Sequence, residues 1–351
     1  MVIHSTYMLR RENQTNKLKY SIFINILITL TLLISGCSQN KTKTISSPTI
    51  TPTSTPTPVA KNLPSVVVTT TVLCNLTKQI AKDTVNLSCL ISPSTDPTKY
   101  EPKSEDTKDI EEAKLILYNG YNLENKLIPV IKTSKNKTPK VSVGELAVPK
   151  PLLSKVKNKT VKNKEIPDPY VWHDASNAIK IIDVISDSLG KAIPENSNIY
   201  SSNSIKLKNE IIQLDKWIKE RIETIPDEKR LLVTTHDEMG YYIKAYGIKY
   251  NAALAGVNLE DKPTEENIEQ LAKNLKKSKP ITIFPESNIN PQLIAAAAKK
   301  AEVRVSERQL FTNNLGKAGS EGDSYQKMMT ANTRTIVEGL DGTYLIFSTK
   351  P

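Results

Sequence analysis

Short apolar runs alternate along this chain with longer segments in which apolar residues recur at helical spacing. Apolar runs at 66–70, 85–91, 115–118 and 141–143 predict buried strands, and the segments 76–82, 103–112 and 123–132 between them predict helices. The same rhythm returns further on, with strands expected at 231–235, 249–254, 281–284 and 303–305 and helices at 241–245, 265–276, 291–301 and 324–338. Strands that alternate with helices indicate parallel sheets, so the pattern predicts two α/β lobes.

One long helix is expected between the two lobes. Within 204–222 no Gly or Pro interrupts the helical spacing of Ile205, Leu207, Ile211, Leu214 and Ile218. We therefore expect an N-terminal α/β lobe at 63–194, a linking helix at 195–224 and a C-terminal α/β lobe at 225–351. A further helix is expected at 174–191, whereas the Lys-rich, apolar-poor segment 149–166 is expected to be a surface loop.

The first 37 residues have the order of an export signal. A basic stretch that includes Arg10 and Lys19 precedes an apolar run at 22–34, and Ser35-Gly36-Cys37 follows. The string 33–37 resembles the lipobox of bacterial lipoproteins, which implies cleavage before Cys37 and a lipid on its thiol. An ordinary signal peptide or a short anchor helix is the alternative. Residues 38–62 are rich in Thr, Pro and Ser, which predicts a disordered tether.

Charge and cysteine content fit an exported protein. The net charge is +11, but the excess is spread over many Lys residues and no aromatic-basic module is visible, so nucleic acid is not an expected partner. Cys37 aside, Cys74 and Cys89 are the remaining cysteines. An even pair in an oxidising compartment predicts a disulfide, and two buried thiols are the alternative.

Two Asp-Pro turns introduce a wider set of motifs. Turns at the carboxyl ends of parallel strands are where α/β proteins place ligand groups. The motifs are TDPTKYEP at 95–102, YNGYNLE at 118–124, DPYVW at 168–172, VTTH at 233–236, KAYG at 244–247 and GDSYQKMM at 322–329. In this order they resemble the manganese/zinc solute-binding proteins of bacterial ABC importers, most of all the cyanobacterial manganese-binding branch. The resemblance implies two α/β lobes bridged by a rigid helix, with a metal ion held between them.

The resemblance also implies four metal ligands, and the sequence departs from them. Two of the four positions map onto His236 and Asp323, but the two His expected in the Asp-Pro turns are replaced by Thr98 and Tyr170. A phenolate at Tyr170 would suit a hard trivalent ion such as iron. Each remaining candidate also has a structural explanation, such as a hydrogen-bonded His at the end of a strand or an Asp at a helix start.

Two further residues are candidates to compensate for the missing ligands. His173 follows Tyr170 by three residues and would share its face on a helical turn, and Glu286 ends a predicted strand. For His173 a surface position is the alternative. With both expected imidazoles replaced, divalent metal binding is expected to be weaker than in a relative that has all four ligands.

The function expected from these features is extracytoplasmic capture of a divalent transition metal for an ABC permease. Manganese is favoured and zinc is next, because segment 149–166 lacks a His-rich composition. The lipid-anchored protein is expected to be a monomer. A degenerate lipoprotein that no longer binds metal and offers a binding or adhesion surface is the alternative. An enzyme is not expected. His236, Asp237 and Glu238 look like an acid-base cluster, but no nucleophile motif or open catalytic metal site accompanies them. Solvated charges of a loop explain them adequately.

Overall fold

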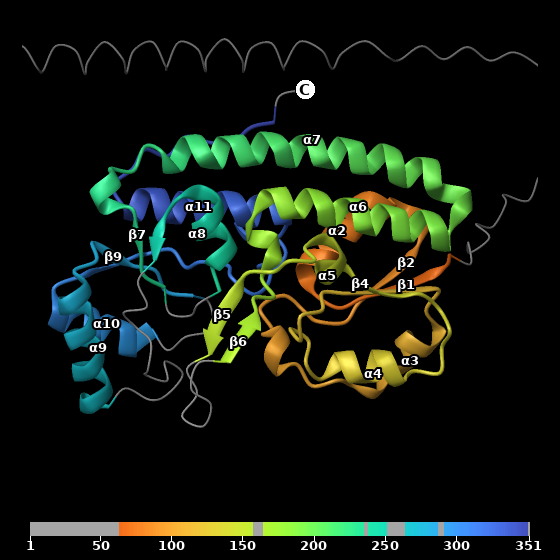
Figure 1. Ribbon diagram of the computed structural model, residues 1–351, viewed down its shortest axis with the longest axis horizontal. Coiled ribbons are helices and arrows are strands. Elements are labelled where there is room, and N and C mark those ends of the chain that lie inside the picture. Colours follow the sequence, from red (N-terminus) through yellow and green to blue (C-terminus); the bar gives the residue numbers. More distant parts are fainter. Residues whose placement is uncertain (1–62, 157–163, 235–237, 251–263, 287–290, 350–351) are drawn as a thin grey trace, which may run out of the picture. The chain divides into compact units, whose positions relative to one another are not determined.

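The computed structural model describes residues 63–156, 164–234, 238–250, 264–286 and 291–349 (Figure 1). Residues 1–62, with Cys37 and the expected tether, lie outside this part of the chain. The N-terminal half contains a four-stranded parallel sheet in the order β2-β1-β3-β4. Its strands are β1 (Ser65–Val68), β2 (Asn86–Cys89), β3 (Leu115–Tyr118) and β4 (Lys140–Ser142).

Helices cover both faces of this sheet. Alternate residues of a strand point to opposite faces, so Val66 and Val68 join one apolar cluster and Val67 joins another. The helices around the sheet are α2 (Thr71–Ala81), α3 (Ser104–Glu112), α4 (Leu127–Thr133) and the short α5 (Val143–Ala147). Cys74 of α2 and Cys89 of β2 form a disulfide.

The longest helix packs along the core that the two halves share. Figure 1 shows α7 (Ser197–Ile222) beside α6 (Ala175–Ala192), and the two helices are in contact. α7 falls within the linking helix expected at 195–224, and its first turns, which are rich in Ser and Asn, bury only Tyr200 and Ser204. Its apolar face joins one continuous cluster that runs from Val66 in β1 to Leu340 after α11 (Tyr325–Gly339). No helix within the described residues is long and apolar enough to span a bilayer.

The C-terminal half has shorter strands. β7 (Leu231–Leu232) pairs with β8 (Lys249–Tyr250), and β9 (Thr282–Ile283) pairs with β10 (Arg304–Val305), each in parallel over two residues. A parallel bridge between Thr234 and Phe284 connects the two pairs. The helices are α8 (Gly240–Tyr246), α9 (Glu265–Ser278) and α10 (Pro291–Ala301). The prediction of a parallel α/β fold is therefore confirmed.

The structure corrects the prediction that segment 149–166 is a surface loop. Its two ends form an antiparallel hairpin of β5 (Leu153–Val156) and β6 (Lys164–Pro167). Leu153 and Ile166 remain 55% and 37% exposed. None of the hairpin side chains that the structure describes is buried, and the sequence lacks the alternation of apolar and polar residues by which a strand is recognised. The expected limits of the lobes stay predictions.

Candidate functional site

The two Asp-Pro turns have the same local geometry. Asp96 accepts a hydrogen bond from the backbone N–H of Thr98 at 2.9 Å, and Asp168 accepts one from the backbone N–H of Tyr170 at 2.9 Å. Each turn closes on the residue two positions after its Asp, as an Asx turn does. The Thr98 hydroxyl also donates to Asp96 at 2.7 Å. The third residue of each turn is thereby fixed in place.

Thr98 and Tyr170 line one cavity of about 750 Å³. Its walls come from loops that follow the carboxyl ends of strands, where α/β proteins bind ligands, and from the β5–β6 hairpin. The other described lining residues are Tyr121, Asn122, Leu123, Glu145, Ser154, Glu165, Ile166, Pro167, Pro169 and Glu238. Three of them are carboxylates, and none of the described lining residues is Lys, Arg or His.

Tyr170 joins the cavity to the C-terminal half. Its hydroxyl donates to Glu238 Oε1 at 3.0 Å, and the hydroxyl of Thr312 donates to Glu238 Oε2. Burial, followed by the negative charge of Glu238, raises the pKa of Tyr170 well above its usual value. Tyr170 is therefore a neutral phenol at ordinary pH in the protein alone.

A buried carboxylate shapes the loop that follows β3. Glu124 accepts hydrogen bonds from the Thr69 hydroxyl at 2.5 Å, from the Asn119 N–H at 2.7 Å and from the Gly120 N–H at 3.3 Å. The loop has positive φ angles at Gly120 (87°), Tyr121 (52°) and Asn122, a backbone conformation that costs energy for residues other than Gly. Burial raises the pKa of Glu124. Its hydrogen bonds hold Tyr121 and Asn122 on the cavity wall.

His173 is fully buried and does not line the cavity. Its Nε2 lies 2.6 Å from the backbone oxygen of Thr312, so this nitrogen carries the proton, and Nδ1 has no hydrogen-bond partner within the described residues. Burial lowers the pKa of His173 to about 4. The alternative of a surface residue is wrong, and a ligand role for His173 stays a prediction.

Of the other three predicted ligands, the two that the structure describes, Glu286 and Asp323, are not among the residues that line the cavity. His236 lies outside the described residues. Glu286 is 1% exposed and forms a parallel bridge with Leu310, and it is not among the described residues that line the cavity. Asp323 accepts from the Gly319 N–H at 2.9 Å and pairs with Lys327 at 2.9 Å. Their roles as ligands stay predictions.

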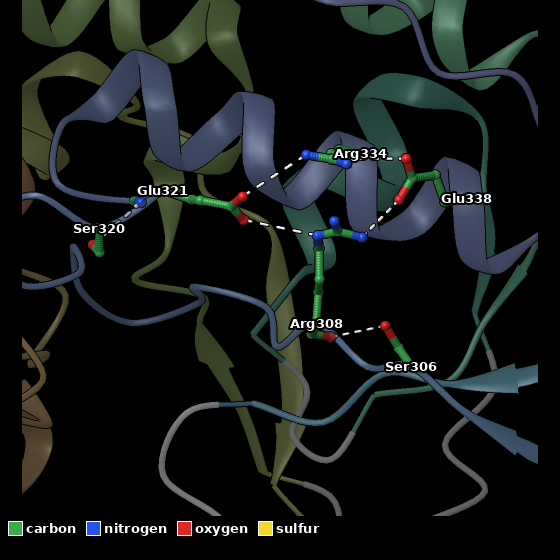
Figure 2. A network of polar contacts seen from close by, with 7 residues as sticks. Ser306, Arg308, Ser320, Glu321, Arg334 and Glu338 are labelled. Atoms are coloured by element: carbon green, nitrogen blue, oxygen red, sulfur yellow. Dashed lines mark hydrogen bonds and ion pairs between the residues drawn. The ribbon is translucent and has the colours of Figure 1, made fainter. Parts of the chain in front are cut away.

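The loop that carries Asp323 is anchored by a separate charged network. Figure 2 shows Arg308 and Arg334 each lying between Glu321 and Glu338. Arg308 approaches Glu338 at 2.9 Å and Glu321 at 3.8 Å, and Arg334 approaches the same two residues at 3.1 and 3.8 Å. The network ties the segment before α11 to α11 itself. Asp323 lies two residues before α11 begins, directly before the N-cap Ser324.

Two residues close to Tyr170 were not predicted as site residues. Glu238 is 9% exposed and Thr312 is 3% exposed, so the view of Glu238 as a solvated loop charge is wrong. The available signal was the position of Glu238 in a charged string directly before a predicted helix. The sequence around Thr312 did not indicate that this residue is buried. Its neighbours Asn313 and Asn314 are polar, as in a surface loop, and yet they are buried too. Within the described residues, no three His, Cys, Asp or Glu side chains are placed to hold a metal ion.

Known proteins resemble this chain over most of its length. Manganese ABC transporter substrate-binding lipoprotein PsaA of Streptococcus mitis is 33% identical over 283 residues, which cover 78% of this chain and 88% of PsaA. The lipoprotein scaA of Streptococcus gordonii, also named for manganese, is 30% identical over 326 residues, 91% of this chain and 98% of scaA.

A solved structure and a family model agree with these relatives. The periplasmic zinc-binding protein TroA of Treponema pallidum has a TM-score of 0.68 and 27% identity, and the match covers 79% of this chain and 99% of TroA. The family model described as zinc-uptake complex component A, periplasmic (ZnuA), matches residues 66–339. Because the family model matches most of the chain, from β1 to the end of α11, the chain belongs to the ZnuA family.

Proposed function

We propose that this protein is the extracytoplasmic solute-binding component of an ABC importer and that it captures a divalent transition metal. One observation supports this most directly. The cavity at the strand ends of a ZnuA-family fold is lined by three carboxylates and no described basic residue, although the whole chain has a net charge of +11. A cavity of this charge attracts cations and repels anions.

Manganese is the favoured metal and zinc is next. The described cavity offers oxygen atoms from carboxylates, hydroxyls and an amide, which suit manganese better than they suit zinc. Relatives named for manganese and a structural neighbour named for zinc agree with this order of candidates. The captured ion would be delivered to a membrane permease, as expected for the substrate-binding component of an importer.

The relatives' names also support an anchored protein outside the cytoplasm. PsaA and scaA are both lipoproteins by name, and the string that ends at Cys37 is the feature of this chain that would carry the lipid. The Cys74–Cys89 disulfide fits an oxidising compartment. A monomer tethered by its lipid is the arrangement we propose.

Metal analysis followed by calorimetry tests this function. Protein purified without chelator is expected to contain manganese or zinc, and titration of the stripped protein is expected to show one site for manganese. Thr98→His combined with Tyr170→His should raise affinity by orders of magnitude, because it adds two imidazole ligands. Asp323→Asn in the same titrations decides whether that carboxylate takes part. If neither metal binds the wild type or the double variant, the alternative of a degenerate lipoprotein replaces this function.

A further inference from the structure

A second cavity, of about 440 Å³, opens beside α11 and shares no described lining residue with the cavity at the strand ends. Tyr344 and Phe347, from the segment that follows α11, form part of its wall. Arg334 of α11 and Glu321 of the loop before this helix form another part. Its volume falls within the range of sites for small organic molecules. Aromatic rings beside charged groups restrict the chemistry of a molecule that could enter.

The aromatic part of the wall is built against α7. The ring centroid of Trp217 lies 5.9 Å from that of Tyr344 and 5.5 Å from that of Phe347. The Nε1–H of Trp217 also donates to the backbone oxygen of Leu345 at 3.1 Å, between the two aromatic residues in the chain. Trp217 therefore holds Tyr344 and Phe347 in place, so the apolar wall does not need a ligand to form it.

Two guanidinium groups converge on the Glu321 side chain (Figure 2). Arg308 Nε and Arg334 Nη1 each lie 3.8 Å from one of its carboxylate oxygens, which is longer than the roughly 2.9 Å of a charge-assisted hydrogen bond. Both arginines instead donate to Glu338, at 2.9 and 3.1 Å. Glu338 balances one of the two positive charges. Glu321, with 61% of its side chain exposed, is a loosely held partner for the other.

The Glu321 side chain can leave its place without a change in the backbone. The next residue, Gly322, accepts a hydrogen bond from the Gly316 N–H at 2.9 Å. A Cβ atom at Gly322 would lie 2.7 Å from the ring of Phe311, so the loop is closely packed at this point. Rotation of the Glu321 side chain towards solvent would leave one unbalanced positive charge on the two arginines.

We propose that this cavity binds a small organic carboxylate with a flat apolar body, and that the ligand takes the place of the Glu321 carboxylate. The ligand's carboxylate accepts hydrogen bonds from Arg308 and Arg334, because the planar guanidinium presents its N–H donors in the geometry that a carboxylate matches. Its apolar body lies against Tyr344 and Phe347.

Charge sets the selectivity of this site. Glu338 leaves one guanidinium charge unbalanced, so a monoanion matches the site better than the dianion of inorganic phosphate does. Glu321 competes with the ligand from within the chain, and the apparent affinity is reduced by the fraction of molecules in which Glu321 occupies the place. The inference goes beyond the proposed function and does not depend on it, because the two cavities share no described residue.

Calorimetric titration with 2-naphthoate tests this site. The wild type should bind 2-naphthoate at one site, at least about 10-fold more tightly than 2-naphthamide, which has the same body without the charge. Inorganic phosphate, which lacks the apolar body, should also bind at least about 10-fold more weakly. Glu321→Gln removes the competing charge and should raise the affinity for 2-naphthoate by about 10-fold. Arg334→Gln removes a guanidinium and should lower it by about 10- to 100-fold.

Two further variants separate the walls of the cavity. Phe347→Ala should weaken 2-naphthoate by about 10-fold and leave phosphate unchanged, because only the apolar body meets this ring. The matched control is Arg304→Gln. Arg304 is an exposed arginine that bonds Asp341 at 2.9 Å and is not among the described lining residues. This variant should bind 2-naphthoate as the wild type does.

The outcomes that overturn the inference are distinct from failure of the proposed function. Absence of saturable 2-naphthoate binding in both the wild type and Glu321→Gln overturns it, as does equal affinity in the wild type and Arg334→Gln. Phosphate binding as tight as that of 2-naphthoate rules out a part for the apolar wall. Should Arg334→Gln not fold, as judged by thermal unfolding, Arg334→Lys replaces it and must still bind about 10-fold more weakly. The manganese titration of the wild type tests the proposed function separately.

Discussion

The two halves of this protein position their cavity residues in different ways. In the N-terminal half, four strands pair in one parallel sheet over three or four residues each, and the loops at the strand ends rest on it. In the C-terminal half, β7 to β10 pair over two residues each. Glu238 and Thr312 there are held by side-chain hydrogen bonds and by contacts with the other half.

The difference in strand pairing indicates that the N-terminal half provides more of the rigidity of the site. The N-terminal sheet provides a platform of paired strands, and the loops that carry Thr98 and Tyr121 follow those strands. The C-terminal residues depend on contacts that cross between the halves. The continuous core shared by both halves, with α7 along it, fits the small movements expected around a rigid helix.

The largest effect is expected at Glu124, which supports the loop after β3. Glu124→Ala removes the acceptor of the Thr69 hydroxyl and of two backbone N–H groups, all of them buried. Buried donors that lose their partner are costly, and we expect the free energy of unfolding to fall by about 4 to 5 kcal/mol. Urea denaturation measures this loss. Glu124→Gln keeps an acceptor of the same shape and should lose less, and a loss below about 1 kcal/mol in Glu124→Ala would contradict the platform.

The next effect compares equivalent core residues of the two halves. Ile116 of β3 and Ile283 of β9 are both fully buried. β3 is paired on both sides along its length, so its surroundings cannot collapse into the space that Ile116→Ala leaves. We expect a loss of about 3 to 4 kcal/mol for Ile116→Ala and about 2 kcal/mol for Ile283→Ala. Equal losses by denaturant unfolding would show that the halves are equally rigid.

The third effect concerns the contact from His173 to Thr312. The pKa of His173 is lowered to about 4 in the folded protein and is about 6.5 in an unfolded chain. Between these values the unfolded chain binds the extra proton, so stability is full above pH 6.5 and is lost as the pH falls towards 4. We expect a loss of about 2 to 3 kcal/mol from this group.

A variant without the titrating ring isolates that contribution. His173→Gln keeps a nitrogen that can donate to the Thr312 backbone oxygen but takes up no proton. The free energy of unfolding should be measured for both proteins from pH 7 to pH 4.5, and the gap between them should change by about 2 kcal/mol. If the two curves stay parallel, the buried ring of His173 does not titrate as its burial indicates.

Regular, strongly patterned segments were predictable from the sequence alone. The predicted strand at 115–118 and the predicted helix at 291–301 occur at those residues. In both segments the fold buries the large apolar side chains of the sequence. The hairpin of β5 and β6 was not predictable, because the described side chains of these strands are not buried and the sequence shows no apolar alternation there. The short strands of the C-terminal half were expected to be longer, because apolar residues such as Val233 and Phe284 continue past the paired residues.

The residues of the candidate site also divide into those that a local pattern indicates and those that no local pattern indicates. The Asp-Pro turns identified Thr98 and Tyr170 because Pro and Asp impose a local geometry that the sequence displays. Glu238 could not be recognised as buried, because its burial depends on Gly240 lying against Asp168, a contact between residues 72 positions apart. Asp323 follows a segment that a charged network joins to α11 (Figure 2), and its role as a ligand stays a prediction.

The sequence by itself determined the α/β class, the family and the two turns, because periodicity and turn chemistry act over a few residues. Tertiary structure decided which charges face the cavity. A carboxylate becomes a buried anion only when distant segments close around it, and the pairing of Glu238 with Tyr170 and Thr312 spans 68 and 74 positions of the chain. Local sequence patterns do not report separations of that length, so the donors that surround Glu238 are set by the packing of the two halves.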